Sequence, residues 1–362
     1  MGLFERGIKL LLKNRRVEQL PIEWSEVRRI AVFSNMAIGD TLFSTPIFRI
    51  LKNRFPEKEL IAVLNPSNYQ LFATNPHLDR ILLYDGRTRT FPRAVRELKQ
   101  LRPEVVVIGH SNEPQATPLA LLSGARYIIK TPNHLNPFRK FHSHPPVKPI
   151  PDKHGIFSRL EGLRLAGVEW KKREVVPELF LKEEWKEQAR EAVEAWKSSG
   201  KLVGFQVGAS TPSRRWYPER WAELGKILLD RHPDLTIALL GGPADRQLGD
   251  EVERRLHSHR VVNWVGRFPL PVAAAILGEL DLLITPDTGP LHIAATLGTP
   301  TLALYVVASP FNTNPFWEPA KHPFIYKPRP CFRCIAKRCP VPFCMLQITV
   351  SEVAEKAEPF LL

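Results

Sequence analysis

Residues 285–295 read Thr-Pro-Asp-Thr-Gly-Pro-Leu-His-Ile-Ala-Ala, and this stretch decides the fold. The apolar residues before it predict a short buried strand. Gly289 and Pro290 predict a tight turn into an apolar helix over 291–297. A helix that begins this way directs unpaired backbone N–H groups at whatever lies in front of it. Asp287 lies there and can accept hydrogen bonds from hydroxyl groups, so the stretch suits a sugar joined to a phosphate.

The same alternation of strand and helix signals continues outward from this stretch in both directions. It predicts parallel, helix-covered sheets. A strong amphipathic helix at 183–199 divides the chain into two α/β domains, 1–182 and 183–362. Ligands of such sheets bind beyond the carboxyl ends of the strands, so we expect the site in a cleft between the two sheets. The expected strands are 28–34, 59–64, 80–84, 104–109 and 127–130, then 202–207, 235–240, 261–265, 281–285 and 301–307.

The composition points to an acidic partner. The net charge is +14 and the pI is near 9.8, which is typical of proteins that bind nucleic acid, an anionic membrane or a phosphorylated substrate. No uninterrupted apolar run reaches the ~18 residues of a membrane-spanning helix. The start of the chain lacks the pattern of a signal peptide, and four cysteines do not make a secreted disulfide scaffold. We therefore expect a cytoplasmic location.

Two segments of the first domain carry concentrated basic charge. Residues 1–16 predict a basic amphipathic helix, which would either lie in a membrane interface or pack as an ordinary surface helix. Residues 130–156 hold six prolines, four histidines and five Lys or Arg residues against one Asp. This composition predicts a long surface loop, either functional or merely solvated. Within it, Arg139 and Lys140 are candidates for acceptor binding.

Four loops that follow predicted strands carry polar groups. They are Gly39-Asp40, the segment 208–216, the segment 241–245 and the Asp287 stretch. Each alone is a weak signal, since Gly and Asp often fill loops for conformational reasons. Three at one sheet edge of the second domain predict a nucleotide site. Neither a GxxxxGK[ST] nor a GxGxxG motif occurs where a P-loop or nicotinamide enzyme needs it, and GxSxG and HExxH are absent.

These motifs resemble, in kind and order, those of the bacterial heptosyltransferases, glycosyltransferase family 9. The resemblance rests on Gly39-Asp40-Thr41-Leu42, Arg214-x-Trp216, Gly242-Pro243 and the stretch 287–295, and it spans roughly residues 28–350. It implies a GT-B fold, in which two Rossmann-like domains face each other across a cleft. The C-terminal domain would bind the nucleotide-sugar and the N-terminal domain the acceptor.

The resemblance also implies an inverting transfer of heptose from ADP-heptose to the inner core (Kdo or heptose) of a lipopolysaccharide precursor, without a catalytic cofactor. Asp40 would be the general base. Arg214 stands where the family usually has a phosphate-binding Lys. The implied partners are an ADP-sugar and an anionic lipid A–Kdo acceptor at the inner face of the inner membrane, with no nucleic acid and a monomeric enzyme. The implied donor-binding residues are Ser210, Thr211, Arg214, Gly242, Asp245, Asp287, Thr288, Gly289 and His292.

Several of these residues have simpler explanations. Asp40 and Asp245 could each cap a helix, His292 could be packed in its helix, and Trp216 could anchor its loop. The whole protein also has alternatives. The same fold could use a different donor or acceptor, or the chain could be a basic nucleic-acid-binding protein with a four-cysteine metal module, which would leave the post-strand loops unexplained.

All four cysteines lie between residues 331 and 344, at Cys331, Cys334, Cys339 and Cys344. A structural zinc site is chemically reasonable, although the spacing is tighter than in two CxxC knuckles joined by a longer loop. Local disulfides, an iron–sulfur site and free thiols are the alternatives.

Overall fold

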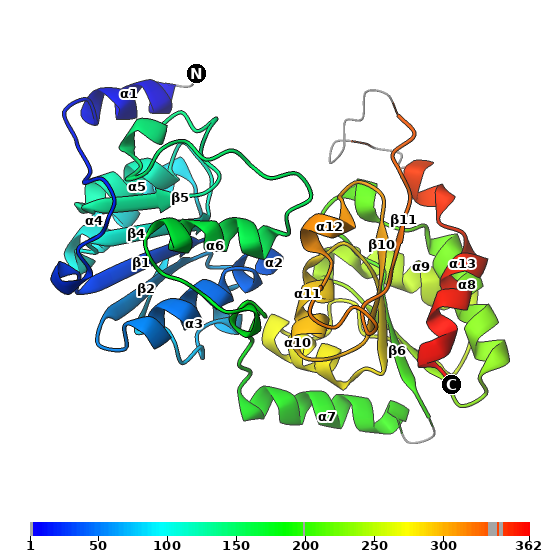
Figure 1. The fold of residues 1–362 in the computed structure, drawn as a ribbon. Coiled ribbons are helices and arrows are strands. Elements are labelled where there is room, and N and C mark those ends of the chain that lie inside the picture. The colour runs from blue at the N-terminus through cyan, green and yellow to red at the C-terminus, as the bar shows by residue number, and fades with distance from the viewer. Residues whose placement is uncertain (1–2, 198–199, 332–338, 340–342) are drawn as a thin grey trace. The chain divides into compact units, whose positions relative to one another are not determined.

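The computed structural model describes residues 3–197, 200–331, 339 and 343–362 (Figure 1). It divides into two compact units, Met1–Phe180 and Leu181–Leu362, whereas the sequence predicted a boundary after residue 182. We call them unit 1 and unit 2. Within the described residues, no helix combines the length and the apolar character needed to cross a membrane.

Unit 1 contains a five-stranded parallel sheet in the order β3-β2-β1-β4-β5. Helices α3 and α6 pack beside each other on one face and α4 and α5 on the other (Figure 1). The strands are β1 (Arg29–Ser34), β2 (Glu59–Leu64), β3 (Arg80–Leu83), β4 (Val105–His110) and β5 (Tyr127–Lys130). The helices are α1 (Leu3–Leu11), α2 (Ile38–Leu42), α3 (Thr45–Arg54), α4 (Phe91–Leu101), α5 (Ala116–Ser123) and α6 (Gly155–Leu165).

Unit 2 contains a six-stranded parallel sheet in the order β11-β10-β9-β6-β7-β8. Helices α8, α9 and α13 pack together, as do α7, α10 and α11. The strands are β6 (Leu202–Gln206), β7 (Thr236–Leu240), β8 (Val261–Asn263), β9 (Leu282–Pro286), β10 (Thr301–Tyr305) and β11 (Phe324–Tyr326). The helices are α7 (Glu183–Lys197), α8 (Pro218–Arg231), α9 (Arg246–Leu256), α10 (Leu270–Glu279), α11 (Gly289–Thr296), α12 (Pro310–Thr313) and α13 (Val350–Ala357).

Every strand predicted from the sequence is present. Nine of the ten are apolar runs that are largely buried on both faces, as parallel sheets require, whereas the edge strand β3 has Arg80 and Leu83 exposed. The sequence predicts a loop over 35–40 and then a helix through about residue 54, with Pro46 either kinking that helix or marking its start. The structure has the short helix α2 in place of the end of the loop, and α3 begins at Thr45 with Pro46 in its first turn. The helix predicted at 67–74 is wrong: only the single 3₁₀ turn Tyr69–Leu71 forms there. Strand β11 and helix α6 were not predicted. Both follow proline-rich sequence that hides the short pattern.

The basic helix predicted over residues 1–16 is shorter than expected and ends at Leu11. Ile8 and Leu12 are buried in the core of unit 1, in one cluster with Phe138. Leu10 and Leu11 point the other way and are 75% and 69% exposed. Helix α1 is therefore both packed on unit 1 and apolar on its outer side.

Candidate functional site

Asp40 lies beyond the carboxyl end of β1, in the first turn of α2. The N-cap of α2 is Ala37, and no side chain caps this helix, so capping does not explain Asp40. The backbone of Asp40 is fixed instead: Ser44 donates a hydrogen bond from Oγ to the Asp40 carbonyl over 3.1 Å, and Ser34 donates to Ser44 Oγ over 2.9 Å. A Cβ on Gly109 of β4 would lie 3.1 Å from Ser44 Oγ, so this arrangement favours glycine there.

The carboxylate of Asp40 is held through one oxygen. Arg159 of α6 donates from Nη2 to Oδ1 over 2.8 Å, and Nε2 of His110, the last residue of β4, lies 3.4 Å from the same oxygen. The Asp40 side chain is 31% exposed, whereas that of Arg159 is 7% exposed. The Arg159 guanidinium lies 5.4 Å from the centre of the Phe43 ring. Burial lowers the pKa of Arg159, and Asp40 opposes that shift.

The loop 130–156 does not lie wholly on the surface, as its composition predicted, because its middle is buried. Phe138, His142 and His144 are at most 3% exposed. His142 makes 3.0 Å contacts through Nε2 to Thr117 Oγ1 and through Nδ1 to the Asn133 amide. Burial, and after it the charges of His144 and Lys130, lowers the pKa of His142 to about 3. The loop is thus fastened beside β4 and β5.

The two acceptor-binding candidates lie on the outside of this fastened loop. Arg139 and Lys140 are both exposed. Arg139 donates to the His134 carbonyl over 3.0 Å, and the Lys140 ammonium lies 4.7 Å from the Phe141 ring centre. Among the described residues, neither Arg139 nor Lys140 makes a hydrogen bond or ion pair with Asp40. They form a basic surface beside the Ile8–Phe138 packing of α1.

In unit 2, Asp287 follows β9 and lies against Arg214. Arg214 contacts the Asp287 carbonyl through Nη1 over 3.1 Å and the carboxylate Oδ2 through Nη2 over 3.4 Å. Here the carboxylate is the buried partner, with 8% of the side chain exposed against 23% for Arg214. Thr313 donates to Asp287 Oδ1 over 3.4 Å, and His292 Nε2 lies 3.9 Å from that oxygen. The structure therefore brings Arg214, Asp287 and His292 together.

The predicted helix opening also forms. Thr288 is the N-cap of α11, with Gly289 and Pro290 as its first residues. The Thr288 hydroxyl contacts Thr285 Oγ1 over 3.2 Å and the Pro286 carbonyl over 3.3 Å, so it is engaged within the turn. On the loop after β6, Ser210 is exposed and Thr211 is half-buried.

Asp245 is engaged within the protein. Its carboxylate accepts from the Gly242 backbone N–H over 3.1 Å and from Arg215 Nη2 over 3.2 Å. A Cβ on Gly208 would lie 2.0 Å from Asp245 Oδ2, so only glycine fits there. Asp245 occupies the N-cap position of α9 but makes no side-chain capping bond to that helix, so capping of α9 does not explain its carboxylate. The carboxylate instead closes the turn before α9 and holds Arg215 beside the predicted donor residues.

Sequence reasoning missed several residues of these two clusters, chiefly Arg159, His110 and Thr313, and it included Arg215 only as part of the segment 208–216. His110 carried a usable signal, as a polar residue directly after a predicted strand. Arg215 neighbours Arg214 in the chain. Arg159 had no signal, because it comes from the unpredicted helix α6, 119 residues from its partner.

The cysteine cluster is only partly described. Cys334 lies outside the described residues, so the predicted four-cysteine zinc site remains a prediction. Cys331 is exposed, and Cys339 and Cys344 are half-buried. In the described part of the chain, no group of three or more His, Cys, Asp or Glu side chains could hold a metal ion. Burial, and then Cys344 and Cys339, raise the pKa of Tyr217, so these two cysteines lie near that ring.

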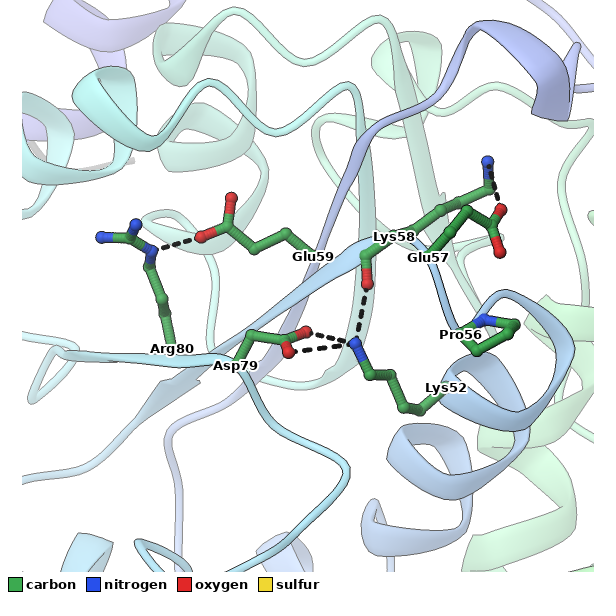
Figure 2. A pocket seen from close by; sticks show the side chains of 7 residues that line it. All are labelled: Lys52, Pro56, Glu57, Lys58, Glu59, Asp79 and Arg80. Carbon is green, nitrogen blue, oxygen red and sulfur yellow. Dashed lines mark hydrogen bonds and ion pairs between the residues drawn. The ribbon is translucent and has the colours of Figure 1, made fainter.

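Unit 1 also has a hollow of about 570 Å³ (Figure 2). It lies where β2 and β3 begin, at the edge of the sheet opposite to the one that carries Asp40. Its charged side chains neutralise one another. Lys52 bonds both oxygens of Asp79, at 2.7 and 3.0 Å, and Arg80 pairs with Glu59. Equal numbers of acidic and basic groups leave no net charge to attract a ligand, and ion pairs this exposed contribute little. The lining residues are Lys52, Pro56, Glu57, Lys58, Glu59, Asp79 and Arg80.

Residues 139–343, more than half of the chain, match the family described as glycosyltransferase family 9 (heptosyltransferase). Lipopolysaccharide heptosyltransferase 2 of Escherichia coli (strain K12) is 32% identical over 124 residues, which are 33% of this chain and 35% of that protein. The chain therefore spans about a third of the length of this curated relative.

Several solved structures match nearly the whole chain. The glycosyl transferase family 9 protein from Veillonella parvula DSM 2008 has a TM-score of 0.78 at 22% identity, and the match covers 95% of this chain and 99% of that one. E. coli ADP-heptose lps heptosyltransferase II has a TM-score of 0.69 at 20% identity, covering 92% and 98%. The predicted fold class, α/β with the two Rossmann-like units of the GT-B fold, is confirmed.

Proposed function

The chain belongs to glycosyltransferase family 9, the heptosyltransferase family, and from this premise we propose that it transfers heptose from ADP-heptose to the inner core of a lipopolysaccharide precursor with inversion. The observation that carries the proposal is Asp40. Its carboxylate is partly exposed, lies at the carboxyl end of β1, and is held from one side by Arg159. An accessible, oriented carboxylate at this edge suits a general base.

In the proposed reaction, Asp40 takes the proton of an acceptor hydroxyl as that oxygen attacks the anomeric carbon. The bond from the anomeric carbon to the diphosphate breaks, and ADP leaves with the electron pair. Attack opposite the leaving group inverts the configuration. One carboxylate is sufficient for this role, and general-base assistance typically contributes 10²–10⁴-fold in rate.

Unit 2 would bind the donor. Arg214 is oriented by Asp287 and still 23% exposed, so it can lend positive charge to the leaving diphosphate. The backbone amides of Thr288 and Gly289 and the hydroxyls of Ser210 and Thr211 would support the same group. Gly242 and Asp245 would lie near the ribose, and Asp287 and His292 near the sugar. In this mechanism the enzyme works as a monomer without a catalytic cofactor, and any zinc at the cysteines would be structural.

The acceptor would be an anionic, lipid-linked saccharide of the lipid A–Kdo type. The net charge of +14 and the exposed Arg139 and Lys140 suit its phosphates and carboxylates. Its lipid would hold the reaction at the cytoplasmic face of the inner membrane. The outer side of α1, with Leu10 and Leu11 exposed, would rest on that membrane.

The transfer test offers the purified protein ADP-heptose or UDP-sugars, with and without a Kdo-bearing lipid A acceptor, and measures nucleotide release. We expect ADP release that requires the acceptor and disappears in Asp40→Asn. Absence of ADP-sugar binding, combined with salt-sensitive binding of RNA or DNA, would overturn the proposal in favour of a nucleic-acid-binding protein.

Membrane contact needs a separate test, by flotation with vesicles that contain an anionic lipid. Leu10→Ser combined with Leu11→Ser should reduce the bound fraction, because two exposed leucines no longer enter the interface. Phe311→Ser is the matched control, since Phe311 is an exposed apolar residue of unit 2, 59% accessible. Equal loss in both proteins would show that α1 is not the contact.

A further inference from the structure

We propose that Arg159 is the positioning residue of the reaction: it holds Asp40 by Oδ1 so that Oδ2 alone is presented to the acceptor hydroxyl. The effect on catalysis that we expect rests on the proposed function. The fixed orientation of the Asp40 carboxylate by Arg159, which we call the clamp, rests on the geometry around Asp40 alone.

The first step of the argument is that the two oxygens of Asp40 are not equivalent. Both polar contacts of the carboxylate, from Arg159 at 2.8 Å and His110 at 3.4 Å, end on Oδ1. Within the described ranges, Oδ2 accepts no hydrogen bond, and the shortest contacts of both basic partners are to Oδ1. Because the side chain is 31% exposed, the oxygen that remains available can meet a substrate.

The second step is that Arg159 is buried and packed against a ring. It projects from α6 and is 7% exposed, with its guanidinium against the Phe43 ring at 5.4 Å. Its Nε makes no hydrogen bond to the described residues, so Asp40 is the group that compensates its buried charge. A planar guanidinium packed on a ring leaves one orientation for the carboxylate that it binds.

The third step excludes an effect on the main chain. The Asp40 backbone is already fixed by Ser44, and its helix by the Thr41 hydroxyl, which donates to the Ser34 carbonyl over 3.0 Å. The Arg159 bond therefore adds control of the side-chain rotamer. Rotamer control matters for a base, since a displacement of about 1 Å at the reacting atoms can cost about 100-fold in rate.

The buried loop 130–156 leads directly into helix α6 and so contributes to the position of Arg159. His154, the last part of that loop, is the N-cap of α6, and its ring lies 5.0 Å from the Phe43 ring. The buried middle of the loop thus fixes the start of the helix that delivers Arg159. The prolines and histidines, which seemed to belong to a solvated loop, support the catalytic geometry in this view.

The test compares Arg159→Gln with Arg164→Gln, a control on the same helix whose guanidinium lies over Trp170 and not over Phe43. Thermal unfolding checks that unit 1 of each variant is folded, and donor binding counts the molecules in which unit 2 is intact. For Arg159→Gln we expect kcat per donor-binding site to fall about 100-fold with the donor KM unchanged, since orientation is lost while unit 2 is intact. In Arg159→Ala, added guanidinium should restore kcat, whereas equal concentrations of sodium chloride or urea should not.

An unchanged kcat per donor-binding site in Arg159→Gln would overturn the proposal, because a purely structural ion pair affects only the amount of folded enzyme. If Arg159→Gln does not fold, Arg159→Lys takes its place in the test. Lysine keeps the buried positive charge but replaces the planar guanidinium, with its paired N–H donors, by a single ammonium group. A wild-type kcat in that variant would equally overturn it.

A crystal structure of Arg159→Gln tests the clamp independently of the proposed function. We expect the Asp40 carboxylate to adopt another rotamer or two conformers. A carboxylate in its original place would refute the clamp even if the wild-type chain transfers heptose. Conversely, a wild-type chain without transferase activity would refute the proposed function while the rotamer result still decides the clamp.

Discussion

In unit 1 the exposed partner of the Asp40–Arg159 pair is the carboxylate, whereas in unit 2 the exposed partner of the Asp287–Arg214 pair is the guanidinium. Asp40 is 31% exposed against 7% for Arg159, and Asp287 is 8% exposed against 23% for Arg214. A buried cation that orients an open carboxylate suits proton transfer. A buried carboxylate that orients an open cation suits binding of a phosphate group. The same two residue types thus give two chemistries, depending on which one is buried.

Asp40→Asn gives the largest effect expected from this difference. The amide keeps an oxygen for Arg159 but cannot accept the acceptor proton, so kcat should fall about 10²–10⁴-fold. ADP affinity, measured by calorimetry, should not change, because it depends on unit 2. Asp152→Asn, an exposed aspartate of unit 1, is the control. A comparable kcat for the two variants would show that the open carboxylate is not the base.

Arg214→Gln tests the other half of the comparison. Losing charge-assisted hydrogen bonds to a diphosphate costs about 1.5–3 kcal/mol, so the Kd for ADP should rise roughly 10- to 100-fold. Arg255→Gln is the control, since Arg255 pairs with Glu219 and Glu251 on the surface. If Arg159→Gln weakened ADP binding as much as Arg214→Gln, the division of roles between the two arginines would be wrong.

The sequence predicted the fold far better than it predicted these pairs. Apolar runs locate buried parallel strands because such strands are covered on both faces, and all ten predicted strands occur. Strand β11, with three residues, is too short to carry a pattern. The stretch around Asp287 was predictable because its turn, proline and helix are adjacent in the chain. Arg159 was not, since nothing local in α6 signals a partner 119 residues away.

The sequence could not supply the partner of a distant residue such as Arg159, and it also could not supply the burial of individual side chains. Composition indicated a surface loop at 130–156, yet Phe138 and His142 are buried there. Asp245 illustrates the same point in unit 2: its position after β7 suggested ribose binding, while its contacts to Gly242 and Arg215 show a carboxylate already engaged in the turn. Chemical type is visible in a sequence, but the identity of the partner depends on packing.

Gly208→Ala would sharpen the account of Asp245. The added methyl group would lie 2.0 Å from Oδ2 and 2.2 Å from Cγ of Asp245, so the carboxylate must leave its contacts. Overpacking of this kind costs up to about 3 kcal/mol, which should lower the Tm of unit 2 and weaken ADP binding. Gly7→Ala is the matched control: no atom lies within 4 Å of its Cβ position, and alanine favours the helix. Unaltered melting in Gly208→Ala would mean that Asp245 moves freely.

The smallest expected effect concerns two of the buried histidines, His142 of unit 1 and His322 of unit 2. Burial lowers the pKa of His142 to about 3 and that of His322 to about 4. The unfolded chain takes up these protons near pH 6.5 while the folded chain does not. The stabilisation is therefore complete above pH 6.5 and is lost as the pH falls toward the folded-state values.

For His142 the loss amounts to about 1.4 kcal/mol per pH unit, or about 2 kcal/mol between pH 6.5 and 5. Urea unfolding at pH 7 and pH 5 measures it. His142→Gln should reduce the acid sensitivity of the transition assigned to unit 1, and His322→Gln that of the transition assigned to unit 2. If His142→Gln left the pH dependence unaltered, the pKa of His142 in the folded protein would equal its value in the unfolded chain. The loop that holds α6, and with it Arg159, would then be looser than the contacts of His142 with Thr117 and Asn133 indicate.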